Sequence, residues 1–435
     1  MNPIRQIPGE RQLTAAAHGH MLTNAGVWSA DGRWLVYDTR SAVDGSSFDG
    51  TRIERVCVES GRVERLYESR NEACCGVVTS SPLDDRVVFI LGPEDPDPDW
   101  RYGPARRQGV VVRAGRPGVA EPLDARDLVP PFTPGALRGG SHVHQFSGDG
   151  RLVSFTYEDA VLEAAQGQGE RNLRGVGVAV CNRGVTVPRA HRRNHDGAAF
   201  SVLVTELADE PPAGSDAIAK AFEEAWIGGD GYLRSDGSRQ RYALAFQGHV
   251  RSTSGDLVSE VFVVDLPDDP AAVEIAGERP LAGTPLTRPA PPRGVVQRRL
   301  TRTTDRRHPG LQGPRHWLRS SPDGELIACL MRDDDGRVQL FAVATADGRL
   351  RQVTRDAWDV ASSFSWSPDG GRIAYVADGS VMTVDVATGR SHRLTPRTTG
   401  GHAPRPEACV FSPDGRTIAY MRTLDHNQLF VVDAG

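Results

Sequence analysis

Short apolar segments with alternating polarity recur along the chain, each beside a turn rich in Ser, Pro, Asp and Gly. The clearest copies read WSADGRWLVYD from Trp28, FSGDGRLVSFT from Phe146, SSPDGELIACL from Ser320, WSPDGGRIAYV from Trp366 and FSPDGRTIAYM from Phe411. In such turns Pro presets φ, Asp bonds its own backbone and Gly accepts a positive φ. The period-two alternation on either side predicts β-strands.

Two weaker copies, SSPLDDRVVFIL from Ser80 and LRSDGSRQRYALAF from Leu233, bring the number of repeats to seven. Two further strands follow each turn, most clearly SVMTVDV from Ser380 and RSHRLT from Arg390. Four antiparallel strands joined by tight turns make one blade of a β-propeller. The sequence therefore predicts an all-β protein, a seven-bladed β-propeller of four-stranded blades in a single domain, 1–435.

The two ends of the chain complement each other. The last repeat contains only three strands and ends in QLFVVDAG from Gln428, whereas ERQLT from Glu10 matches the fourth-strand segment RQVT from Arg351. We therefore predict that residues near 10–14 pair with the strand near 428–433 and close the ring. Closure of this kind removes exposed sheet edges.

Long insertions indicate which face of the ring carries the function. In each blade, the loop that leads into the first strand and the loop that joins strands two and three share one face, which we name the loop side. The Asp-Gly turns lie on the opposite face, the turn side. Insertions at about 158–174, 189–230 and 267–294 are predicted on the loop side, the second with a helix capped near Ser215. Binding residues gather on long loops of rigid scaffolds.

Ionisable side chains occupy equivalent positions of several first strands, two or four residues before the residue that opens each repeat. They are His142, His144, His316 and Glu407, and His20 lies in the segment before blade one. Because alternate residues of a strand share a side, we expect this set to converge at the channel mouth. Imidazoles with a carboxylate suit Zn²⁺, Mn²⁺ or Fe²⁺, so a divalent metal site is predicted. The alternative is that these histidines only bond the backbone.

Three arginines and one asparagine adjoin the same positions and are predicted to bind substrate: Asn24, Arg138, Arg315 and Arg405. Arginine can hold a carboxylate with two parallel hydrogen bonds, although surface ion pairs are the alternative. No catalytic residue is singled out. The chain has no GxSxG, HExxH, Walker or dinucleotide-binding motif in a suitable context.

Composition restricts the partners and the compartment. A net charge of −5 gives no basic surplus for nucleic acid. No stretch approaches the roughly 18 apolar residues of a membrane span, and MNPIRQIPGERQLT lacks a signal-peptide core. Six cysteines without ligand spacing agree with a reducing compartment. We predict a cytoplasmic protein with no nucleic-acid or membrane partner. Lys220, the only lysine, is the single candidate for a lysine-based mechanism.

The repeats carry a family resemblance. The WSPDG-R-IAY units resemble the TolB-type propeller repeat (PD40, WD40-like). The segments HGHMLTN, PGALRGGSHVH, PRHWLRSSPDG and RPEACVFSPDG together resemble an uncharacterised bacterial TolB-like family over nearly the whole chain. A more distant resemblance is to oligogalacturonate lyase, a propeller lyase that holds a divalent metal with histidines. Its histidines do not match the same positions, so the resemblance implies no residue roles.

Two functions follow from these observations. The first is a metal-dependent enzyme, such as a lyase, acting on a small polar or acidic, sugar-acid-like molecule at the channel mouth. There the metal and arginines would bind the carboxylate and a neutral histidine would remove the α-proton. The second is a non-catalytic propeller that binds a protein or peptide on the loop side. Convergent His and Glu side chains around a pocket would favour the enzyme, and a broad apolar patch the interaction protein.

Overall fold

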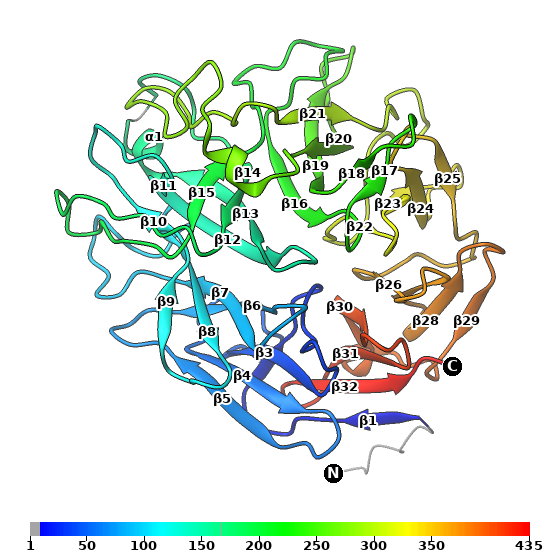
Figure 1. The fold of residues 1–435 in the computed structure, drawn as a ribbon. Helices are drawn as coiled ribbons and strands as arrows, with labels where there is room; N and C mark the ends of the chain where they lie inside the picture. Colours follow the sequence, from blue (N-terminus) through cyan, green and yellow to red (C-terminus); the bar gives the residue numbers. More distant parts are fainter. Residues whose placement is uncertain (1–8, 166) are drawn as a thin grey trace.

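Seven four-stranded antiparallel sheets surround a central channel in the computed structural model, which describes residues 9–165 and 167–435 (Figure 1). Blades one to three consist of β2 (Gly19–Met21), β3 (Trp34–Arg40), β4 (Arg52–Cys57) and β5 (Val63–Glu68); β6 (Cys75–Ser80), β7 (Arg86–Leu91), β8 (Gln108–Arg113) and β9 (Ala120–Pro122); and β12 (Gly139–Phe146), β13 (Leu152–Asp159), β14 (Gly175–Val180) and β15 (Phe200–Leu203). The predicted fold class is confirmed.

The remaining blades complete the circle. They consist of β16 (Ala221–Trp226), β19 (Ala243–Arg251), β20 (Leu257–Asp265) and β21 (Val296–Arg299); β22 (Arg319–Ser320), β23 (Leu326–Arg332), β24 (Val338–Ala344) and β25 (Leu350–Gln352); β26 (Ser365–Trp366), β27 (Arg372–Ala377), β28 (Ser380–Asp385) and β29 (Ser391–Arg393); and β30 (Pro404–Phe411), β31 (Thr417–Thr423), β32 (Asn427–Asp433) and β1 (Glu10–Gln12). The first strand of each blade lies nearest the axis (Figure 1).

The ring closes as predicted, because β1 supplies the outer strand of the last blade. Glu10 lies opposite Val432 and Gln12 opposite Phe430 in an antiparallel register. The Nε atom of Arg422 lies 2.7 Å from a carboxylate oxygen of Glu10, and both side chains are 6% exposed. The two ends of the chain are therefore joined by a strand ladder and a buried ion pair.

Apolar side chains fill the space between neighbouring blades. Leu330 and Leu340 of blade five pack with Phe364 and Tyr375 of blade six, and all four are fully buried. The period-two pattern of the repeats produces this arrangement, because both faces of each sheet meet another blade.

Blade four corrects the sequence prediction. The segment from Ser215 does not form a helix; residues 221–226 are β16, which pairs with β19. Pairing with a buried neighbouring strand outweighs the helical propensity of Ala and Glu in this segment. The repeat therefore opens at Trp226, not at Leu233, which lies in a small additional hairpin of β17 (Tyr232–Leu233) and β18 (Arg239–Gln240).

The predicted insertions also need revision. Residues 158–174 do join strands two and three of blade three and include α1 (Ala160–Ala164). Residues 189–230 are not one insertion, because they contain β15 and β16. Residues 267–294 join strands three and four, so they start on the turn side. They reach the loop-side insertion where Arg288 contacts Glu170, with 3.5 Å between Nε and a carboxylate oxygen.

Three consecutive first strands share a strained position. Val77, Val143 and Glu223 have φ angles of 57°, 58° and 55°, and in each case the pairing register with the second strand shifts at this point. A positive φ is unfavourable for a side chain with a Cβ, particularly for branched valine. Strain of this kind is retained where the surrounding structure holds it, often beside a functional site.

Candidate functional site

The central channel contains two cavities, one at each end. The loop-side chamber has a volume of about 480 Å³ and receives residues from five blades, including Asn24, Val77, Arg315, Trp317, Ser363 and Glu407. The turn-side chamber, of about 430 Å³, is lined by the Ser-Pro turns and by Trp28, Phe146, Trp226, Trp366 and Phe411. Asn24 contributes to both chambers. Arg319 of blade five donates to the backbone oxygen of Asn24 in blade one, so its guanidinium crosses the channel between them.

The side of the first strand that faces the axis differs from the expected one. In six of the seven blades the residue two positions before the opening residue is fully buried, away from the channel: Val78, His144, Glu224, Leu318, Phe364 and Cys409. In blade one the equivalent Gly26 is exposed and lines the turn-side chamber. Residues one or three positions before the opening residue, including Val77, Trp317 and Arg319, line the chambers. Of the predicted residues four positions before it, Asn24 and Glu407 also line the loop-side chamber. Periodicity separates the two sides of a strand, but it does not say which side faces the axis.

Two of the predicted metal ligands are occupied by backbone bonds. The Nδ1 atom of His316 lies 2.8 Å from the oxygen of Pro314, and its Nε2 accepts a hydrogen bond from the backbone N–H of Leu330 at 3.2 Å. His20 Nδ1 lies 2.9 Å from the oxygen of Asn427. Burial lowers the pKa of both imidazoles to about 4, so both are neutral at pH 7.

His142 and His144 are also buried, on either side of the strained Val143. His144 Nε2 lies 3.0 Å from the hydroxyl of Ser141, which in turn donates to Asp124. Burial lowers the pKa of His144 to about 3. Burial and the charge of Arg107 hold the pKa of His142 well below its usual value. The Nδ1 atom of His142 has no hydrogen-bond partner among the described residues.

The predicted metal site is not assembled from these residues. Within residues 9–165 and 167–435, no three His, Cys, Asp or Glu side chains form a group that could hold a metal ion. Glu407 instead forms a two-point ion pair with Arg405, with Oε1 2.6 Å and Oε2 3.2 Å from its nitrogens. The donor set required for Zn²⁺, Mn²⁺ or Fe²⁺ is therefore absent from the described part of the channel.

The predicted substrate-binding residues differ in availability. Arg138 is 1% exposed and uses its guanidinium for Asp159 and for the backbone oxygens of Thr284 and Thr287, so it anchors the 267–294 loop. The nitrogen and the oxygen of the Asn24 side-chain amide both bond backbone atoms, and Arg405 is paired with Glu407. Arg315 alone of the four combines an exposed side chain with unused donors.

Arg315 has the geometry of a preorganised anion-binding site. Its Nε donates to Glu223 Oε1 at 2.7 Å, and its guanidinium carbon lies 4.7 Å from the centre of the Trp317 ring. The two Nη atoms make no hydrogen bond to any described residue, and the side chain is 64% exposed. The Trp317 indole N–H is buried and without a partner in the same part of the chain. Two kinds of unused donor therefore adjoin the loop-side chamber.

Two buried carboxylates beside this site were missed from the sequence. Glu223 is 6% exposed, its Oε2 has no partner among the described residues, and burial raises its pKa. Glu224 is fully buried and accepts a hydrogen bond from Thr156; burial raises its pKa to about 7. Glu224 stands at the position equivalent to His144. The repeat identifies this position in every blade. The prediction that the fourth repeat opens at Leu233 assigned Gly231 to it in place of Glu224.

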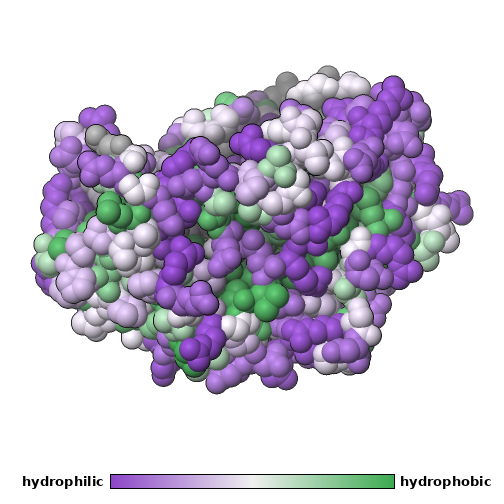
Figure 2. All heavy atoms as spheres, turned by 90° about the horizontal axis from the view of Figure 1, so that it is seen from above, coloured by the Kyte–Doolittle hydropathy of each residue, from purple (hydrophilic) through white to green (hydrophobic). Residues whose placement is uncertain are grey.

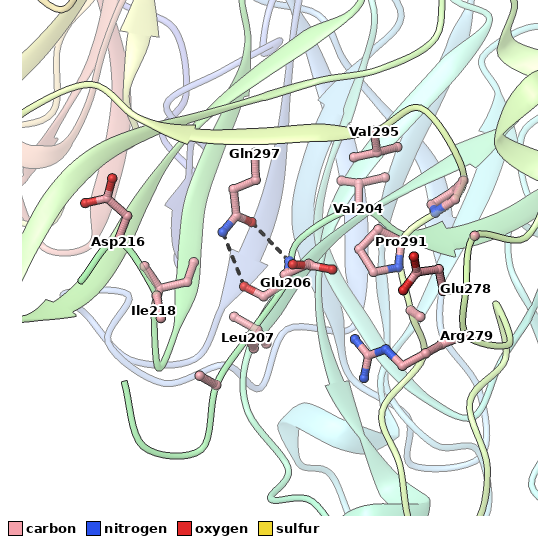
Figure 3. A pocket seen from close by; sticks show the side chains of 15 residues that line it. Val204, Glu206, Leu207, Asp216, Ile218, Glu278, Arg279, Pro291, Val295 and Gln297 are labelled. Atoms are coloured by element: carbon pink, nitrogen blue, oxygen red, sulfur yellow. Dashed lines mark hydrogen bonds between the residues drawn. The ribbon is translucent and has the colours of Figure 1, made fainter. Parts of the chain in front are cut away.

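A further cavity of about 580 Å³ lies at the rim, beneath the 267–294 loop (Figure 3). Gln297 is tied to the backbone of Glu206 by two hydrogen bonds, and Asp216 is paired with Arg302 at 2.6 Å. Val204, Ile218 and Val295 form an apolar wall. Its central polar groups are already bonded, so the rim cavity is a weaker candidate than the channel.

Comparison with known proteins defines the family. The chain is 43% identical over 424 residues to the uncharacterized protein YidR of Escherichia coli (strain K12), covering 97% of this chain and 96% of YidR. The chain belongs to the YidR family. A family model described as a protein of unknown function, DUF3748, matches residues 74–195. The predicted relationship to an uncharacterised bacterial family is thereby confirmed.

Solved structures similar to this YidR-family chain have the same fold. An oligogalacturonate lyase from Vibrio parahaemolyticus aligns with 100% of this chain and 95% of its own at 8% identity, with a TM-score of 0.58. An oligogalacturonate lyase in complex with manganese aligns with 99% and 94% at 13% identity, with a TM-score of 0.56. TolB structures are among the other matches. Identities this low demonstrate a shared fold only. No helix among the described residues is long and apolar enough to span a membrane.

Proposed function

We propose that the loop-side chamber binds a small carboxylate-bearing molecule and that Arg315 is its principal ligand. The observation that carries this proposal is the pair of unused Nη donors of Arg315, held in place by Glu223 and the Trp317 ring. A guanidinium binds a carboxylate through two parallel hydrogen bonds, and both remaining donors lie on one edge of this group. The buried indole N–H of Trp317 supplies a third donor beside it.

The finer part of the proposal concerns the reaction. The fold, which is shared with oligogalacturonate lyases, agrees with a lyase that acts on a sugar acid. The described residues, however, do not assemble a metal site. The residues present support acid–base chemistry by this chain's own groups. His142 is neutral and has an unpartnered nitrogen, and Glu223 has a free oxygen next to the carboxylate anchor. Such groups can accept a proton from a carbon that is acidified by a bound carboxylate.

The alternative, a protein-binding propeller, has less support on the surface. The large hydrophobic side chains with high exposure belong to blades one, two and four, where they lie in loops, in outer strands, in the additional hairpin or at the start of β20: Val43, Val63, Leu83, Val119, Leu233, Leu257, Ile275, Leu286 and Val296. In the edge-on view of Figure 2, hydrophobic residues form small patches among hydrophilic ones. Protein-binding surfaces normally show a larger continuous apolar area.

Calorimetric titration with galacturonate, and with galactose as the neutral analogue, tests the proposal. We expect the wild-type protein to bind galacturonate and not galactose, and Arg315→Gln to lower the affinity at least tenfold. Arg302→Gln is the matched control, because Arg302 is similarly exposed (61%) and also pairs with one carboxylate, at the rim. Equal binding of the two sugars, or an equal effect of both variants, would contradict the assignment.

A further inference from the structure

The turn-side chamber contains a single charged side chain. Among the described residues that line its volume of about 430 Å³, only Arg319 carries a charge. The rest of the wall includes the five aromatic side chains of the opening positions and four prolines of the Ser-Pro turns. A cavity of this volume, with an apolar wall and one polar anchor, is typical of a small-molecule site.

The charge of Arg319 has no counter-ion among the described residues. This half-buried group donates from Nη2 to the backbone oxygen of Asn24 at 2.9 Å. Its Nη1 lies 3.3 and 3.4 Å from two oxygens, both longer than a good hydrogen bond, and its Nε has no partner. Burial lowers the pKa of Arg319 only to about 10, so the group is charged at pH 7. A charge in this setting is stabilised when an anion binds beside it.

The walls of the chamber offer aromatic rings and few free polar atoms. The indole N–H groups of Trp28, Trp226 and Trp366 donate to backbone oxygens of the neighbouring blades. The hydroxyls of the turn serines bond the aspartates of their own turns. Aromatic rings pack edge-to-face or offset against other rings, and they also attract cations, which Arg319 repels. The chamber therefore suits a ligand with an aromatic body and one negative charge.

We propose that the turn-side chamber binds a small aromatic carboxylate, whose ring lies among the aromatic side chains and whose carboxylate lies against Arg319. Nη1, which has only long contacts, and the second hydrogen of Nη2 are the donors available to it. The ring of the ligand displaces water from the apolar wall. This site is separate from the proposed function, because Arg315 does not line this chamber and Arg319 does not line the loop-side chamber.

Calorimetric titration of the full-length protein with 2-naphthoate, and with 2-naphthamide as the neutral analogue, tests the inference. We expect naphthoate to bind at least tenfold more tightly than the amide. Arg319→Gln should lower the naphthoate affinity at least tenfold and leave the amide affinity unchanged, whereas Arg319→Lys should retain part of the difference. Arg298→Gln is the matched control, because Arg298 is also half-buried and donates to a backbone oxygen at 2.9 Å, but lies in the outer strand of blade four.

A second variant is needed because Arg319 also connects blades one and five, and its loss could unfold the protein. Ala30 is an exposed turn residue that lines the chamber, so Ala30→Glu should lower the naphthoate affinity at least threefold by charge repulsion. Equal affinities for acid and amide, or an unchanged naphthoate affinity in either variant, would overturn the inference. Loss of naphthoate binding in Arg315→Gln alone would place the acid in the loop-side chamber and would also overturn it.

Discussion

The two ends of the channel are built from the same seven strands, yet they use their polar groups in opposite ways. On the turn side, the indole N–H groups of Trp28, Trp226 and Trp366 donate to backbone oxygens of the neighbouring blade, at 3.2, 2.9 and 2.9 Å. On the loop side, Trp317, Arg315 and Glu223 keep polar atoms without partners among the described residues. The repeated end holds the blades together, and the irregular end presents unused donors and acceptors. We therefore place the proposed function at the end where the repeat is broken.

The largest expected effect on stability comes from Glu224. At this position the first strand of blade four carries a carboxyl group, whereas blades five and six carry apolar side chains. Between its usual pKa of 4.5 and the folded value of about 7, the folded protein holds a proton that the unfolded chain has released. Stability therefore falls as the pH rises through this window, by about 3 kcal/mol for one such group. Glu224→Gln should remove this loss.

Denaturant unfolding of both proteins at pH 5 and pH 8 measures the difference. The variant should gain about 3 kcal/mol relative to the wild type between the two pH values. The buried histidines titrate in both proteins and cancel in the comparison. A difference that does not change with pH would show that Glu224 is ionised in the folded protein.

A matched pair of tryptophans tests the contrast between the two ends directly. Trp366 and Trp317 are 8% and 9% exposed, but only Trp366 has a bonded indole N–H. Trp366→Phe should lower the free energy of unfolding by about 1–3 kcal/mol more than Trp317→Phe, because it leaves a buried carbonyl oxygen unpaired. Equal losses in thermal or denaturant unfolding would mean that the two ends are alike energetically.

The smallest expected effect is on the stability of Arg315→Gln. The guanidinium is 64% exposed, whereas its partner Glu223 is buried. Because burial already raises the pKa of Glu223, this carboxyl group can take up a proton when the arginine is removed, and the loss stays near that of an exposed ion pair, at most about 1 kcal/mol. The free energy of unfolding should therefore change by less than about 1 kcal/mol, as for Arg302→Gln. A loss as large as that of Trp366→Phe would make Arg315 a structural residue and remove the reason for assigning it to a ligand.

The sequence by itself determined the blades and their closure. Turn chemistry and alternation are local properties, so turns rich in Ser, Pro, Asp and Gly identified six of the seven first turns, and ERQLT identified the strand that completes the last blade. Blade four was displaced by seven residues because the additional hairpin of β17 and β18 lies between its first and second strands, and the Ser-Asp-Gly segment at 235–237 belongs to that hairpin. Local patterns identify a strand only where its turn is regular.

The tertiary structure alone decided which predicted residues are available. His316 and Arg138 have the residue types of a site, but backbone groups already occupy them: Pro314 and Leu330 bond the imidazole, and the distant Thr287 bonds the guanidinium. Arg315 was predicted on the same grounds, and its two Nη atoms remain unbonded within the described part of the chain, because its guanidinium bonds Glu223 through Nε and stacks on Trp317. The orientation of the first strands and the positive φ at Val143 and Glu223 depend on packing around the axis. A sequence specifies which groups are present, and long-range contacts determine which of them are still unbonded.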